Sequence, residues 1–113
     1  MKKFIVLYHA PKDAMEQTSA LSPEEQAEGM ALWMKWAKKC GGYLVDLGSP
    51  LVNGQRLSPE NKSTPSEKQV AGYSILQADN MEDAVKLLQD HPHLGWNAAC
   101  SIEVHEAMPL PGT

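Results

Sequence analysis

An apolar run close to the start of the chain places the strongest limit on the fold. Residues 3–9 read KFIVLYH, a series of β-forming side chains without regular alternation, and Pro11 closes the run. Such a run is typical of a strand that is covered on both faces of its sheet. The first strand therefore requires helices on one side of the sheet and a second layer on the other.

A helix is predicted over residues 23–40. Ser22 stands at the N-cap position, Pro23 at the first helical position and Glu25 three residues after the cap, which is the pattern of a capping box. Lysines gather near the other end, where the helix dipole favours cations. Gly41 and the glycine after it provide the left-handed stop.

This helix is apolar around much of its circumference. Ala27, Met30, Met34 and Ala37 have the spacing of a core face. Trp33 and Trp36 lie to its flank, and Cys40 continues their row. A helix of this kind needs a second cover besides its own sheet. That cover is a long loop, a ligand or another protomer.

The rest of the chain predicts three further strands and one helix. The strands are expected over residues 43–47, 70–78 and 99–106. The helix begins after Asp79 or Asn80 as its cap, and Pro92 ends it.

Residues 48–69 are rich in Gly, Pro, Ser and Asn and have no helical period. A structureless loop of this length is uncommon in a compact domain. Asn53-Gly54 has the composition of a hairpin turn. We therefore expect a hairpin arm over residues 48–69, between the second and third strands.

The order β-α-β-β-α-β predicts an α+β protein of the ferredoxin-like, split β-α-β type. The 113 residues form one domain, residues 1–113. Both helices would cover one sheet face, so the other face needs a partner. A second copy of the chain satisfies this need most simply, and a homodimer is expected.

Composition excludes several classes of partner. The net charge is −4, and the only lysine pairs are Lys2-Lys3 and Lys38-Lys39, so nucleic acid is not an expected partner. No apolar run is long enough for a membrane span or a signal peptide, which predicts a cytoplasmic protein with no membrane association. Cys40 and Cys100 are expected to be reduced thiols in that compartment.

Several segments together resemble one family. They are KKFIVLYH, GMALWMKWAKK, LVDLGSPLVNG, AGYSILQADN, HPHLGW and CSIEVHEAMPLPG, and they span nearly the whole chain. The chain is similar in these segments to the YCII-related proteins, in the branch also called the DGPF domain. The resemblance implies a ferredoxin-like fold that dimerises into an α/β barrel.

The resemblance transfers no active site. A His–Asp pair has been proposed for the smaller YciI branch, but the predicted first helix here has no histidine. Where the family has Asp-Pro after the second helix, this chain has His91-Pro92.

His93 is the candidate general base, because an unperturbed imidazole titrates near neutral pH. Trp96 would form an apolar wall that keeps the ring neutral, and Asp46 or Tyr73 would be its polar neighbours. His91 is the weaker candidate, since a helix end favours the charged ring. The alternative is a dipole contact and a surface turn for the histidines and a solvent-facing side chain for Asp46.

The candidate binding residues are Trp33, Trp36, Tyr73, His91 and Trp96. Their flat surfaces suit either an organic ligand or packing in the core and the dimer. Glu103 and His105 share a strand face, but two ligands are too few for a zinc site. No metal site is expected, and the absence of nucleotide-binding motifs predicts no cofactor.

Two functions remain open. One is a cofactor-free enzyme or binder for a small organic molecule, with a pocket between the first long helix, the sheet and the 48–69 arm. The other is a non-catalytic dimeric accessory domain whose exposed aromatic side chains contact a protein partner.

Overall fold

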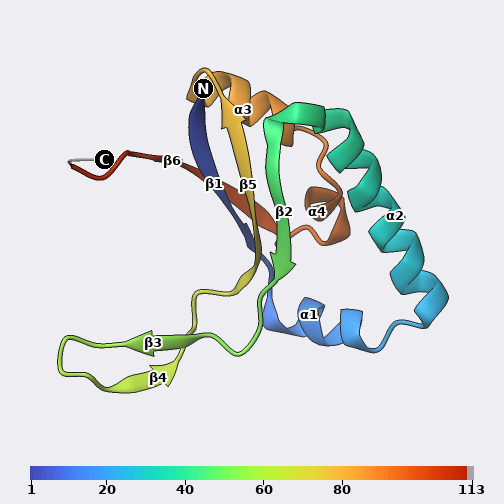
Figure 1. Ribbon diagram of the computed structural model, residues 1–113. Helices are drawn as coiled ribbons and strands as arrows, with labels where there is room; N and C mark the ends of the chain where they lie inside the picture. The colour runs from blue at the N-terminus through green and yellow to red at the C-terminus, as the bar shows by residue number, and fades with distance from the viewer. Residues whose placement is uncertain (112–113) are drawn as a thin grey trace.

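The computed structural model describes residues 1–111, without the side chains of residues 17–19. One antiparallel sheet with the strand order β2-β5-β1-β6 is combined with helices, which confirms the α+β class (Figure 1). The elements are β1 (Lys2–His9), α1 (Lys12–Ser19), α2 (Pro23–Cys40), a 3-10 turn (Gly41–Tyr43), β2 (Leu44–Pro50), β3 (Gln55–Leu57), β4 (Ser63–Pro65), β5 (Val70–Ala78), α3 (Met81–Leu88), α4 (Pro92–Trp96) and β6 (Ser101–Ala107).

The four-stranded sheet is open, with β2 and β6 at its edges, so the sheet of this chain does not close into a barrel. β1 lies in the centre and pairs in antiparallel fashion with both β5 and β6. Among the helices of residues 1–111, none is both long and apolar enough to cross a membrane.

β1 has two different faces. Phe4, Val6 and Tyr8 are fully buried under the helices, together with Leu76 of β5. Ile5 and the other alternate residues of β1 are only partly buried. The helices therefore cover one of the two faces that were expected to be covered, and we call the uncovered side of the sheet the open face.

Helix α2 has the predicted bounds and the predicted capping box. The backbone N–H of Glu25 donates to Ser22 Oγ (3.2 Å), and the N–H of Ser22 donates back to Glu25 Oε1 (3.3 Å). At the other end Gly41 has a φ of 55°, a conformation that glycine adopts without a steric penalty.

The predicted core face of α2 is wrong. Trp36 and Cys40 are buried, whereas Met30 and Met34 are 54% and 52% exposed. Only the C-terminal half of α2 lies close to the sheet (Figure 1). Trp36 fixes this rotation of the helix, because its indole N–H donates to the backbone oxygen of Leu87 (2.8 Å).

The predicted arm is present as the β3–β4 hairpin, but its turn is not at Asn53-Gly54. The strands pair Gln55 with Pro65, and residues 58–62 form the turn. Leu51 does not belong to the arm. Its N–H donates to Ala71 O (3.0 Å) and extends the pairing of β2 with β5. The arm projects away from the sheet on the side opposite α2 (Figure 1).

Two local predictions also need correction. Residues 12–19 form the helix α1, in a segment for which no helix was predicted. Helix α3 ends at Leu88, before Pro92, and Asp90 follows with a φ of 60°. Pro92 instead begins the short helix α4 behind His91 as its N-cap, a position where proline loses no helical hydrogen bond.

Candidate functional site

His91 lies in an aromatic cluster on the helix-covered side of the sheet. Its ring centroid is 4.3 Å from that of Trp36 and 4.5 Å from that of Trp33. The side chain is almost fully buried. Burial, followed by the nearby His93, lowers the pKa of His91 to about 4. His91 is therefore neutral at neutral pH, contrary to the charged ring expected at a helix end.

A buried hydrogen-bond chain starts at this ring, and its direction can be assigned. His91 Nδ1 accepts from the backbone N–H of His93 (3.0 Å), so the proton of the neutral ring is on Nε2. At the far end the Ser74 hydroxyl donates to Leu47 O (2.6 Å). Tyr8 must then donate to Ser74 Oγ (2.7 Å) and accept from His91 Nε2 (3.3 Å).

This chain of hydrogen bonds connects α4, β1, β5 and β2 through the core. Every described polar group along it has a partner, which is what burial requires. Burial is also the main reason that the pKa of Tyr8 rises to about 12. These are the properties of a structural network rather than of groups that exchange protons with a substrate.

His93 has no open access to a substrate. It is buried, and its Nε2–H donates to the backbone oxygen of His9 (2.8 Å). Burial is the largest effect on its pKa and lowers it, against backbone contacts at His9 and Ser101 that raise it. Trp96 is the expected neighbour, with a ring-centroid distance of 5.8 Å. The ring is thus neutral as predicted, but it serves as a donor to the backbone.

Asp46 and Tyr73 were expected to be polar neighbours of His93, but they are not. Asp46 pairs with Ile75 in the β2–β5 register and accepts from the Tyr73 hydroxyl (3.4 Å), which places both side chains on the open face. Its other oxygen accepts from the N–H of Gly48 (2.8 Å). His93 contacts the ring of Tyr8 on the opposite face, so the sheet separates the two groups.

Asp46 has a visible structural role at an irregularity in β2. Gly48 has a φ of 82°, and a Cβ at this position would lie 1.7 Å from Tyr73 O. The register shifts on both sides of Asp46. The carboxylate holds this distorted segment by bonding to the amide two residues later.

The five predicted binding residues are divided among three places. Trp33, Trp36 and His91 do come together on the helix side, packed against Tyr8. Tyr73 lies on the open face. Trp96 is 40% exposed at the edge of α4.

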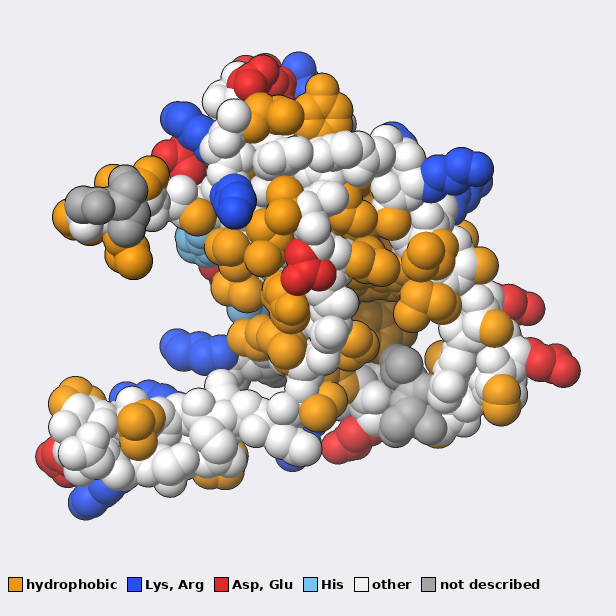
Figure 2. All heavy atoms as spheres, in the orientation of Figure 1, with side chains coloured by type: hydrophobic (Ala, Val, Ile, Leu, Met, Phe, Trp, Pro, Cys, Tyr) orange, Lys and Arg blue, Asp and Glu red, His pale blue; other side chains and the backbone are white. Residues whose placement is uncertain are grey.

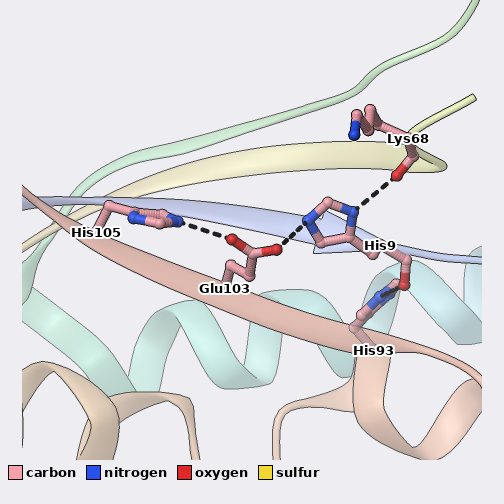
Figure 3. A network of polar contacts seen from close by, with 5 residues as sticks. All are labelled: His9, Lys68, His93, Glu103 and His105. Atoms are coloured by element: carbon pink, nitrogen blue, oxygen red, sulfur yellow. Dashed lines mark hydrogen bonds and ion pairs between the residues drawn. The ribbon is translucent and has the colours of Figure 1, made fainter. Parts of the chain in front are cut away.

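A second group of histidines lies on the open face, where Glu103 bridges His9 and His105 (Figure 3). His105 Nε2 is 2.8 Å from Glu103 Oε1, and His9 Nε2 is 3.2 Å from Oε2. The hydrogen bond from His105 is the largest effect on the pKa of Glu103 and lowers it, and the neighbouring His9 lowers it further. Glu103 is therefore a carboxylate at neutral pH.

The bond to Glu103 also sets the tautomer of His105. A carboxylate only accepts, so the proton of the neutral imidazole is on Nε2 and Nδ1 keeps its lone pair. The His105 side chain is 62% exposed. This arrangement can take a proton from a bound molecule through Nδ1.

The open face offers an apolar floor beside this pair. Ile5 and Leu7 lie opposite His105 and Glu103 in the β1–β6 register, and both face Ile75 or Tyr73 of β5. The arm and the segment that follows β6 project on this side of the sheet (Figure 1). Figure 2 shows the resulting hollow between them, with histidine side chains along its wall.

From the sequence, Glu103 and His105 were considered only as two possible metal ligands, too few for a zinc site. His9 was not a candidate. The period-two spacing of Glu103 and His105 was visible in the sequence. Their link to His9 depends on the pairing of β1 with β6, which no local pattern reveals. In the part of the chain that the structure describes, no group of three His, Cys, Asp or Glu residues is arranged to hold a metal ion.

Comparison with known proteins adds no family or function: no family model matches the chain, and no curated protein is significantly similar to it.

Proposed function

We propose that the protein is a homodimer of ferredoxin-like protomers, of the YCII-related type in its DGPF branch. The strand order supports the fold, because the first main strand lies between the third and the fourth. The open face supports the dimer: Ile5, Leu7 and Ile75 remain partly exposed at its centre. Two such faces brought together would form the α/β barrel and remove these side chains from water.

We further propose that the dimer acts without a cofactor on a small organic molecule bound at the open face. The observation that carries this proposal is the 2.8 Å bond between Glu103 and His105. Glu103 orients the ring and stabilises the imidazolium that forms when Nδ1 takes a proton. Proton transfer by a positioned group contributes roughly 10²- to 10⁴-fold in rate.

The site in this proposal differs in place from the pocket expected from the sequence. Helix α2 and the arm lie on opposite sides of the sheet (Figure 1), and we place the small molecule on the side of the arm. The open face and the arm lie on the same side. The small molecule would bind beside Glu103 and His105 on the edge strand β6, next to the dimer contact of Ile5 and Leu7 and on the same side as the arm.

The test begins with a screen of small organic molecules for thermal stabilisation of the purified protein, followed by an assay for turnover of each hit. His105→Gln should then abolish turnover or weaken binding while the fold is retained. Asp46→Asn is the matched control on the same face and should leave turnover unchanged. Full turnover in the His105 variant would disprove the role of this pair.

The alternative function is a non-catalytic accessory domain, and one observation favours it. Met30, Leu32 and Met34 of α2 are each more than half exposed, and flexible methionine side chains are common at protein-binding surfaces. A stoichiometric protein partner that is lost in Met30→Lys and retained in His105→Gln would support this function over the enzymatic one.

A further inference from the structure

His9 stands between two groups that can only accept a hydrogen bond. Its Nδ1 is 3.1 Å from the backbone oxygen of Lys68. Its Nε2 is buried, has no hydrogen-bond partner and lies 3.2 Å from Glu103 Oε2. A neutral ring has one proton, so it can donate to only one of these two groups. A protonated ring serves both groups.

The backbone around His9 is irregular at the same place. The β1–β5 register shifts between Tyr8 and His9. Immediately before β5, Gln69 has a φ of 57°, and its carbonyl accepts from the N–H of Ala10 (3.0 Å). Lys68 and Gln69 are the residues through which the arm returns to β5. The ring of His9 therefore joins the base of the arm to Glu103 on β6 (Figure 3).

We infer that His9 is a proton-dependent positioning residue: its protonated ring holds Glu103 and the base of the arm in one arrangement. In this state the Glu103 carboxylate is held by one imidazole on each oxygen, and it keeps His105 in the Nε2–H tautomer. When His9 loses its proton, the ring can donate to only one of the two groups. The link that the ring makes between Glu103 and the base of the arm is then broken.

This inference rests on the proposed function only in that His105 is the group being positioned. The charged and titratable groups around His9 come from three sides. Glu103 of β6 faces the ring, and His105 is in contact with the same carboxylate. His93 of α4 donates to the His9 carbonyl and lies close enough for charge repulsion when both rings are protonated. Lys68 presents its carbonyl to the ring.

The experiment follows the imidazole and amide signals of isotope-labelled protein by NMR, between about pH 8 and pH 5, where histidine titrates. The ring of His9 should show two bound protons at the acid end. The backbone amides of Lys68, Gln69 and Glu103 should follow the same titration curve as this ring. The measurement needs no ligand, so a failed ligand screen does not affect its outcome.

Two variants separate His9 from the other imidazole on Glu103. His9→Gln retains a donor for Lys68 but has no titrating group, so the common inflection of the three amides should disappear. His105→Gln should retain it. The inference is overturned if the amides still titrate together in His9→Gln, or if they remain unchanged in the wild-type protein while His9 titrates.

Discussion

Replacing Tyr8 with phenylalanine would remove one oxygen atom from the middle of the buried chain between His91 and Ser74. The hydroxyl accepts from His91 Nε2 and donates to Ser74 Oγ, and Tyr8 is 2% exposed. After the change Ser74 still donates to Leu47 O, but the Nε2–H of His91 has no partner. An unsatisfied buried donor costs about 1–3 kcal/mol, and the lost bond to Ser74 adds about 1 kcal/mol.

We therefore expect Tyr8→Phe to lower the free energy of unfolding by about 2–4 kcal/mol. Urea denaturation followed by tryptophan fluorescence measures this change, because Trp33 packs against Tyr8 and contacts Trp36. Ser74→Ala should be similarly destabilising, and the double variant should be less destabilised than the sum, because both changes break the Tyr8–Ser74 bond.

Tyr73→Phe is the matched control on the other sheet face. Its hydroxyl makes one long bond of 3.4 Å to Asp46 at an exposed site, and its removal should cost less than about 0.5 kcal/mol. Two results would contradict the hydrogen-bond chain from His91 to Leu47. One is a loss of unfolding free energy in Tyr8→Phe that is no larger than in Tyr73→Phe. The other is simple additivity of Tyr8→Phe and Ser74→Ala in the double variant.

Three other properties can be measured on the same protein. Burial lowers the pKa of His91 to about 4, so the unfolded chain binds a proton more readily than the folded protein. The free energy of unfolding should therefore fall as the pH drops from about 6.5 toward 4. Urea titrations of His91→Gln should lack this part of the pH dependence. Gly48→Ala should destabilise by about 3 kcal/mol or more, from its positive φ and the clash with Tyr73 O, whereas Gly42→Ala, with open space around it, should be nearly neutral in the same assay. Leu7→Glu should reduce the mass measured by light scattering from dimer to monomer, and a wild-type protein that is already monomeric at micromolar concentration would refute the dimer.

Local patterns in the sequence were sufficient for the elements whose stability depends on near neighbours. The cap at Ser22 and Glu25 involves residues three apart, and α2 has the bounds that this cap and Gly41 predict. β5 likewise has the predicted bounds, Val70–Ala78, because the alternation of its side chains is contained in the strand itself. The α+β class follows from the order of such elements.

The rotation of α2 and the neighbours of each histidine were decided by the tertiary structure. Trp36 rather than Met34 faces the core because of a hydrogen bond to Leu87, 51 residues away. The β2–β5 register shifts on both sides of Asp46, so the regular alternation of side chains along β2 does not show which face Asp46 occupies. In the structure this face is the one opposite His93.

His9 and Glu103 show most clearly which features the sequence predicts and which ones depend on the tertiary structure. Each lies on a strand that the sequence predicts, and the period of each strand shows which residues share its faces. Only the antiparallel pairing of β1 with β6 brings the two side chains to 3.2 Å. Which residues meet across strands depends on register, and register depends on how the whole sheet packs. The sequence alone therefore determined the main strands and the long helix, while the tertiary structure determined the candidate site.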